Sequence, residues 1–135
     1  MPETFELEIA TPNQLLVREQ VGRAQIPAAN GYVGILPEHS PLLSALGTGE
    51  LTYEVGGKTH RLAVDGGFLE VRPDHVRVLA DRAEKAEDID VERARQALKR
   101  AEERIRNPHE QNIDIARALN AMKRAQSRLR TAEDK

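Results

Sequence analysis

The chain has no cysteine and no tryptophan, and aromatic residues of any kind are scarce. Its 135 residues include only two Phe and two Tyr. The absence of cysteine excludes disulfides and thiolate-ligated metal sites. Because large side chains are so few, aliphatic residues must form the core, and the length allows one ordinary domain or a small domain with a helical extension.

Long hydrophobic segments are missing as well. No apolar run approaches the roughly 20 residues that a membrane-spanning helix needs, and the N-terminus lacks the basic and apolar regions of a secretory signal. We therefore expect contact with a membrane only through partner proteins.

Catalytic and metal-binding motifs are also absent. The four histidines show no metal-ligand spacing, and no Gly-x-x-x-x-Gly-Lys-Ser/Thr loop is present. His39 and Ser40 are adjacent but lack a positioned acid. The Gly-Gly pairs precede no helix, so we interpret them as turns and not as phosphate-binding loops. We expect no catalytic site, no metal site and no required cofactor.

The charge differs in sign between the two parts of the chain. Residues 1–84 hold 7 Lys/Arg and 12 Asp/Glu, a net charge of −5, whereas residues 85–135 hold 13 and 10, a net charge of +3. This contrast predicts two domains with different roles, 1–84 and 85–135.

The first part has the pattern of a β domain. Phe5–Ile9 and Leu51–Val55 alternate apolar and polar residues, as half-buried strands do. Gly56-Gly57, Gly66-Gly67 and Pro73-Asp74 supply turn signals. The strands expected around them are Leu15–Ile26, Tyr32–Leu36, Lys58–Val64, Phe68–Val71 and His75–Leu79. Short strands at this spacing favour an antiparallel β-sandwich or a flattened barrel.

The second part has the pattern of two helices. One apolar stripe at helical spacing contains Val91, Ala94, Leu98, Ala101 and Ile105; the other contains Ile115, Ala118, Met122, Ala125, Leu129 and Ala132. Asp90 and Asp114 are positioned as N-caps, and Asn107-Pro108 ends the first helix. We predict an α+β chain: an N-terminal antiparallel β-sandwich followed by a C-terminal antiparallel α-helical hairpin. Its many alanines bury little area, so the hairpin should close weakly.

The second predicted helix carries one sign of charge. Between residues 115 and 132 it has five basic residues and no carboxylate: Arg117, Lys123, Arg124, Arg128 and Arg130. A solvated helix face with favourable charges in its last turn explains only part of this run. Nucleic acid is disfavoured because no aromatic residue accompanies the charges, and a membrane surface because the apolar face is largely Ala. Nucleotide phosphate or an acidic protein segment fits better.

The segment from Ala29 to Leu42 combines two Gly, two Pro and an apolar run broken by Glu38-His39-Ser40. It suits a proline-stiffened connection between strands and, equally, a docking edge that presents apolar side chains.

Three ordered motifs resemble the ε subunits of bacterial-type F-type ATP synthases. They are Gly34-Ile35-Leu36-Pro37-Glu38-His39-Ser40-Pro41-Leu42-Leu43, then Gly66-Gly67-Phe68-Leu69-Glu70-Val71-Arg72-Pro73 with Val76-Arg77-Val78-Leu79-Ala80, and Ala86-Glu87-Asp88-Ile89-Asp90. The resemblance extends over essentially the whole chain.

The resemblance implies a non-catalytic rotor subunit that couples proton translocation to ATP synthesis at the cytoplasmic face of the inner (plasma) membrane. Its implied partners are the γ subunit, the c-ring and the catalytic α and β subunits, with no nucleic acid. The hairpin of this family lies folded on the sandwich or extends and inhibits ATP hydrolysis. The contact residues it implies here are Tyr32, Glu38, His39, Arg117, Lys123, Arg124 and Arg128.

Some members of the family also bind ATP as a regulatory ligand, through an Ile/Leu-Asp-x-x-Arg-Ala motif and further arginines. The positions that match are Glu84, Ile89, Asp90, Arg93, Ala94, Arg100, Arg124 and Arg128. The same arginines would equally serve an acidic partner. Two departures concern the c-ring contact: the family commonly has an acid in place of Tyr32 and Gly in place of Glu38. The loop between the two predicted helices is also about one residue longer than in the ATP-binding members of the family.

Two other functions remain open on the residues alone. One is a nucleotide-sensing domain that works outside the synthase, and the other is a hairpin adaptor for an acidic protein. Co-purification with a γ-like subunit and nucleotide titration distinguish the three.

Overall fold

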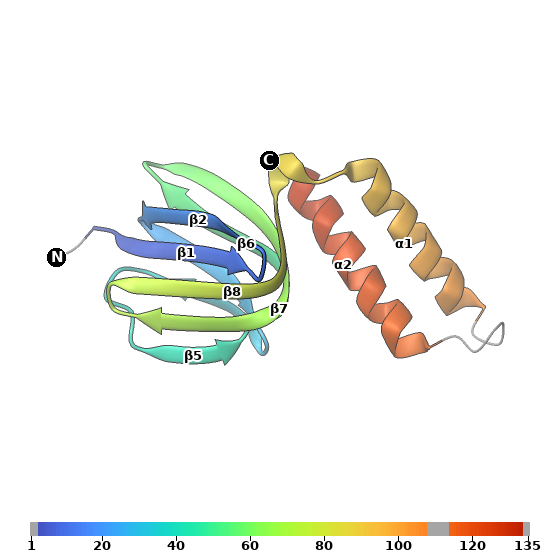
Figure 1. Cartoon of the computed structure of the whole chain (residues 1–135), viewed down its shortest axis with the longest axis horizontal. Coiled ribbons are helices and arrows are strands. Elements are labelled where there is room, and N and C mark those ends of the chain that lie inside the picture. The colour runs from blue at the N-terminus through green and yellow to red at the C-terminus, as the bar shows by residue number, and fades with distance from the viewer. Residues whose placement is uncertain (1–2, 108–113, 134–135) are drawn as a thin grey trace.

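The computed structural model describes residues 3–107 and 114–133, which form a β-sandwich and two packed helices (Figure 1). The strands are β1 (Phe5–Thr11), β2 (Gln14–Val21), β3 (Arg23–Ala28), β4 (Gly31–Ile35), β5 (Leu42–Ala45), β6 (Thr48–Val55), β7 (Lys58–Arg72) and β8 (His75–Lys85). A short 3-10 turn, η1 (Ala86–Asp88), leads to α1 (Val91–Arg106), and α2 (Ile115–Glu133) follows. The predicted α+β class is confirmed.

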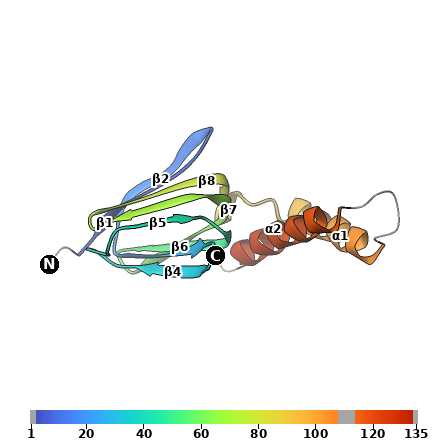
Figure 2. The same ribbon diagram turned by 90° about the horizontal axis from the view of Figure 1, so that it is seen from below.

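The strands form one sheet in the order β2-β1-β8-β7-β6-β3-β4, with β5 paired to β7. Figure 2 shows this sheet folded into two facing layers. Every strand pair in the described residues is antiparallel except β1 with β8, which is parallel. The expectation of a purely antiparallel sandwich is therefore wrong at this one pair. The hairpin with β7 sets the direction of β8, and β1, which lies on the other side of β8, runs in that same direction.

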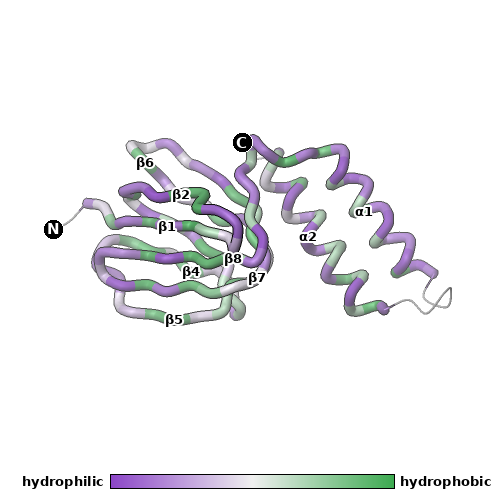
Figure 3. Tube along the Cα trace, in the orientation of Figure 1, coloured by the Kyte–Doolittle hydropathy of each residue, from purple (hydrophilic) through white to green (hydrophobic). Residues whose placement is uncertain are grey.

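The core lies between the layers and is built from aliphatic residues, as the composition predicts. Phe5, Leu7 and Ile9 of β1 are almost completely buried, and the residues between them are half-buried. Figure 3 shows the same alternation of hydrophobic and hydrophilic residues along other strands. Each buried Leu, Ile or Val stabilises the sandwich by about 1.5–3 kcal/mol relative to full exposure.

Gly66 and Gly67 do not form the predicted turn, because β7 runs through them from Lys58 to Arg72. Their φ angles are +69° and +117°. At this point β7 changes its partner from β6 to β5, and Leu46 N donates to Gly67 O at 2.9 Å. The glycines serve a bend inside a long strand. The Gly56-Gly57 turn, with φ +56° and +81°, connects β6 and β7 as predicted.

Other strand boundaries also differ from the sequence pattern. The expected strand Leu15–Ile26 is divided at Gly22 into β2 and β3. β5 lies at the end of the segment interpreted as a loop, and β8 continues six residues past Leu79 to Lys85. The predicted boundary after residue 84 thus lies inside β8.

The helices begin and end where the sequence predicts. Asp90 Oδ1 accepts from Arg93 N at 3.0 Å, and Asp114 Oδ1 accepts from Arg117 N at 3.1 Å. The two helices run antiparallel, and α2 lies between the sandwich and α1 (Figure 1). The sequence predicts that the first helix ends at Asn107-Pro108. Asn107 is the C-cap of α1, and Pro108 lies outside the described residues.

Candidate functional site

The surface under α2 consists of two rows of residues that lie directly opposite one another on β6, β7 and β8. The first row is Thr48–Asp65–Arg82, and the second row is Glu50–Ala63–Glu84. Positions two apart on a strand share a face and lie about 6.6 Å apart. The strand register therefore places Asp65 and Glu84, both candidate partners for cations, on one surface.

Arg124 and Arg128 of α2 match this spacing, because four residues of an α-helix span about 6 Å. Arg124 Nε lies 3.9 Å from Asp65 Oδ2 over the first row. Arg128 Nε lies 2.6 Å from Glu84 Oε1 over the second row, and its Nη2 donates to Glu84 Oε2 at 3.4 Å. The sandwich thus supplies carboxylates to the part of α2, residues 115–132, that has none of its own. The two arginines hold the hairpin against the sandwich.

A hollow of about 300 Å³ lies beside these contacts, between the sandwich and the hairpin. Four arginines and two carboxylates line it: Arg82, Arg93, Arg124, Arg128, Asp65 and Glu84. Within residues 3–107 and 114–133, no carboxylate forms an ion pair with Arg93. The formal charge around the hollow is therefore positive, and guanidinium groups suit phosphate or carboxylate oxygens.

Four arginines match the ATP-binding positions of the family, and three of them line this hollow: Arg93, Arg124 and Arg128. Arg100 is exposed on α1 and does not line it. Ile89 is buried against Ala63 and Ala132, Asp90 caps α1, and Ala94 of α1 is buried. These three residues shape the hairpin. Arg117 and Lys123 are exposed on α2, away from the hollow.

Two charged residues of the hollow, Asp65 and Arg82, were missed by sequence reasoning. Asp65 precedes the Gly66-Gly67 pair, which the pattern marked as a turn, and Arg82 lies beyond the predicted end of the last strand. Because β7 runs through the glycine pair and β8 extends to Lys85, the two residues lie opposite each other in the sheet. Neither strand extension is visible in the sequence pattern.

The candidate contact residues Tyr32, Glu38 and His39 lie on β4 and in the connection to β5. The Tyr32 side chain is 53 % exposed, and its hydroxyl accepts from Glu50 N at 3.1 Å. Glu38 has φ +65°, and its N–H donates to Pro73 O at 2.8 Å. The His39 ring nitrogen Nδ1 lies 2.7 Å from Ser40 O. A carboxylate in this connection thus takes a left-handed conformation that glycine adopts at less cost.

A second surface has apolar residues in one row across five strands. The register aligns Ala45 of β5, Phe68 of β7, Leu79 of β8, Ala10 of β1 and Leu15 of β2. Phe68, Leu79 and Leu15 are each at least 50 % exposed, and Leu43 in the neighbouring row is 74 % exposed. We call these six residues the apolar row. A continuous apolar strip on a small domain is typical of a docking surface.

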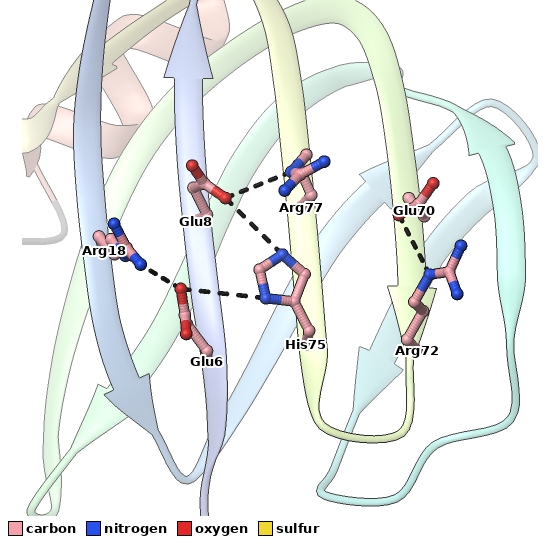
Figure 4. A network of polar contacts seen from close by, with 7 residues as sticks. All are labelled: Glu6, Glu8, Arg18, Glu70, Arg72, His75 and Arg77. Carbon is pink, nitrogen blue, oxygen red and sulfur yellow. Dashed lines mark hydrogen bonds and ion pairs between the residues drawn. The ribbon is translucent and has the colours of Figure 1, made fainter.

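Next to the apolar row lies a lattice of paired charges, drawn in Figure 4. Arg18 pairs with Glu6 at 3.1 Å, Arg77 with Glu8 at 3.2 Å and Arg72 with Glu70 at 3.3 Å. The His75 ring lies between β1 and β8, with its nitrogens 3.9 Å from Glu6 and 3.6 Å from Glu8. The surface therefore combines an apolar strip with charges that already have partners.

Tyr53 marks the end of the core near the β6–β7 turn. Its ring stacks on His60 with centroids 4.9 Å apart. Burial raises the pKa of Tyr53 to about 12, and the charges of Glu19 and Glu87 add to this shift. The phenol therefore stays protonated throughout the physiological range.

Neither a membrane helix nor a metal cluster is found in the part of the chain that the structure describes. Neither α1 nor α2 is long and apolar enough to cross a bilayer. No group of three or more His, Cys, Asp or Glu side chains there could hold a metal ion.

Comparison with protein families gives two adjoining matches. Residues 4–86 match the model described as ATP synthase, Delta/Epsilon chain, beta-sandwich domain. Residues 87–133 match ATP synthase, Delta/Epsilon chain, long alpha-helix domain.

Individual relatives agree with these matches. The chain is 60 % identical over 108 residues to the ATP synthase epsilon chain of Solibacter usitatus, covering 80 % of this chain and 81 % of the relative. It is 51 % identical over 105 residues to that of Koribacter versatilis, covering 78 % and 74 %. A chain in the structure of the Euglena gracilis mitochondrial ATP synthase, OSCP/F1/c-ring, superposes with a TM-score of 0.84 at 26 % identity, covering 98 % of this chain and 83 % of that one. For a chain of the Tetrahymena thermophila mitochondrial ATP synthase central stalk and c-ring, the TM-score is 0.56 at 14 % identity, with 96 % and 94 % covered, a likeness in fold alone.

Proposed function

The chain belongs to the family of ATP synthase delta/epsilon chains, and on this premise we propose that it works in the central stalk of an F-type ATP synthase as a regulated rotor subunit. It is a non-catalytic subunit. In this role it couples proton translocation to ATP synthesis, and it lies at the cytoplasmic face of the membrane only through the subunits that hold it.

The observation that carries this proposal is the apolar row. Phe68, Leu79 and Leu15 are large hydrophobic side chains that are each at least 50 % exposed, whereas the core between the layers is almost completely buried. Their alignment across strands β7, β8 and β2 supports a flat, extended contact with a partner and not a pocket for a small ligand. We assign this surface to the γ subunit. The charge lattice beside it supplies the polar rim of the contact.

The connection around Glu38 and His39, with Tyr32 nearby on β4, is our candidate for the c-ring contact. Glu38 is held in a left-handed conformation by its bond to Pro73 O. A loop fixed in this way presents its side chains at little further cost in entropy. With Tyr32 in place of the family's acid, Glu38 is the carboxylate that this surface offers.

The hairpin is the regulatory part of the proposal. In the folded form Arg124 and Arg128 face Asp65 and Glu84 of the sandwich. When the hairpin extends, the same arginines, together with Arg117 and Lys123, present an unopposed basic face to acidic segments of the catalytic subunits. One set of charges thus serves two states, and inhibition of ATP hydrolysis belongs to the extended one.

ATP is the proposed regulatory ligand, with its phosphates in the hollow lined by Arg93, Arg124 and Arg128. These groups lie on both helices and meet only in the folded hairpin. A ligand that binds only this form stabilises it by mass action and disfavours extension. Arg100 does not line the hollow, so we assign it no phosphate contact.

The assembled synthase tests the proposal in two steps. Phe68→Ser with Leu79→Ser should abolish co-purification with the γ subunit, whereas the exposed Glu92→Gln on α1 should not. Removal of residues 89–135, which keeps β8 and η1 intact, should leave assembly unchanged and raise ATP hydrolysis. Co-purification of the double variant at the wild-type level would contradict the docking assignment, and unchanged hydrolysis would contradict the regulatory one.

A further inference from the structure

The first row, Thr48–Asp65–Arg82, gives the hollow a feature that simple attraction for anions does not explain. It places a carboxylate among the arginines that would bind phosphate. Asp65 lines the hollow together with Arg82, Arg93 and Arg124, and its side chain is only 25 % exposed. A phosphate in this space therefore meets a fixed negative charge.

The Asp65 carboxylate is held from both of its oxygens. Thr48 Oγ1 donates a short hydrogen bond to Oδ1. Arg82 Nη1 lies 3.5 Å from Oδ2, and Arg124 Nε lies 3.9 Å from the same atom. Thr48 and Arg82 are the register partners of Asp65 on β6 and β8. Because strand pairing positions these neighbours, the carboxylate cannot turn away easily when an anion approaches.

Arg82 and Arg124 differ in what they lose when a phosphate arrives. Both lie near one carboxylate oxygen, and neither approaches as closely as Arg128 approaches Glu84 at 2.6 Å. The Arg82 side chain is 67 % exposed. Its long, mobile guanidinium can therefore move from Asp65 to a phosphate oxygen at small cost.

We propose that Asp65 and Arg82 set the affinity of the hollow for phosphate, with Asp65 as a built-in competitor for Arg124 and Arg82 as a further phosphate ligand. The proposal rests on the anion-binding function proposed above for the hollow and names the residues that tune it. The Asp65 carboxylate repels the incoming anion. It also pairs with Arg124 until the anion takes its place beside this arginine. Arg82 supplies the guanidinium that Arg100 does not.

The two residues should therefore act in opposite directions. Asp65→Asn keeps the size of the side chain and a hydrogen-bond acceptor for Thr48 but removes the competing charge. We expect it to tighten binding about tenfold, which corresponds to ~1.4 kcal/mol. Arg82→Ala removes a phosphate ligand and leaves Arg124 as the one arginine near the Asp65 carboxylate. Phosphate binding should therefore weaken by about the same factor. If the row only fixed the hairpin in place, both substitutions would weaken binding.

Calorimetric titration of the full chain with ATP, and separately with inorganic tripolyphosphate, tests this proposal. Thermal unfolding of each variant verifies its fold, and Asp74→Asn at the distant β7–β8 turn is the matched control, with wild-type affinity expected. Tighter binding of both ligands by Asp65→Asn and weaker binding by Arg82→Ala support the proposal. Weaker or unchanged binding by Asp65→Asn overturns it, and unchanged binding by Arg82→Ala does the same even if the Asp65 variant does not fold.

Failure of this proposal differs visibly from failure of the proposed ATP site. If neither the wild type nor Asp65→Asn binds either ligand, the hollow is not a phosphate site and both proposals fall. If wild type binds ATP but the two variants do not change affinity in opposite directions, only the tuning role of the first row falls.

Discussion

Glu84 and Arg128 lie 44 residues apart in the chain, yet Arg128 Nε is 2.6 Å from Glu84 Oε1. This contact joins the last strand of the sandwich to the last third of α2. Together with the looser Asp65–Arg124 pair it supplies the electrostatic part of hairpin docking, because the apolar contact there consists mainly of Ala63, Ile89 and Ala132.

Arg128→Ala should weaken hairpin docking. The pair is only partly buried, so we expect a loss of about 1 kcal/mol, which raises amide hydrogen exchange in α2 about fivefold. Hydrogen exchange measured by mass spectrometry on the full chain provides the test. Arg117→Ala, on the same helix but exposed, is the control and should exchange like wild type; equal exchange in both variants would show that the Glu84 contact contributes nothing.

Substitutions on the two sides of this contact should have opposite effects on ATP hydrolysis by the assembled synthase. Glu84→Gln loosens the hairpin but leaves the basic face of α2 intact, so inhibition should increase. Arg124→Ala with Arg128→Ala also loosens the hairpin but removes charges that face the catalytic subunits, so inhibition should decrease. Steady-state hydrolysis assays at fixed ATP concentration measure both effects. If both variants changed the hydrolysis rate in the same direction, Arg124 and Arg128 would not serve both the folded and the extended state of the hairpin.

Gly67→Ala should destabilise the sandwich by about 3 kcal/mol or more. A Cβ at this position, where φ is +117°, would collide with the carbonyl oxygen of Leu79 on β8. Urea denaturation followed by circular dichroism measures the loss. Gly34→Ala is the matched control, because its new Cβ has no atom within 4 Å and no positive φ to oppose it; comparable stability of the two variants would contradict the assigned strain.

Glu38→Gly should stabilise the chain by about 0.5–1 kcal/mol. The φ of Glu38, +65°, costs a residue with a Cβ about 1 kcal/mol or more, and the greater freedom of glycine in the unfolded chain offsets part of the gain. Glu38→Ala removes the carboxylate but keeps the strain, so its thermal unfolding midpoint should not rise. A rise in both variants would assign the effect to the charge and not to the backbone.

Tyr53 should make stability depend on pH in the alkaline range. Burial raises its pKa to about 12 in the folded chain, above the ordinary value of 10.0. Below pH 10 the phenol is protonated in both states, and its contribution to stability is fully present. As the pH rises from 10 toward 12 the unfolded state loses this proton first, so the free energy of unfolding falls. Urea denaturation across this pH range should show the decline, and Tyr53→Phe should make it less steep. If the free energy of unfolding fell equally with pH in the wild type and in Tyr53→Phe, the raised pKa of Tyr53 would be contradicted.

The sequence alone determined the features that depend on near neighbours. Helical spacing and the caps at Asp90 and Asp114 predicted α1 and α2 closely, because turns of a helix contact residues only three or four positions away. Alternation likewise predicted β1 and β6, and the Gly56-Gly57 pair predicted the turn between β6 and β7. The run of basic residues without a carboxylate between positions 115 and 132 indicated that the partner of these charges lay elsewhere.

Only the tertiary structure decided which residues meet across the fold. Asp65 lies opposite Arg82 because β7 continues through Gly66 and Gly67, and a glycine pair carries the same local signal in a turn as in a bent strand. The parallel pairing of β1 with β8 and the position of Arg124 above Asp65 depend likewise on contacts between distant segments. Strand register is set by the burial of a whole face, so the carboxylates that oppose α2 could not be identified from the residues around it.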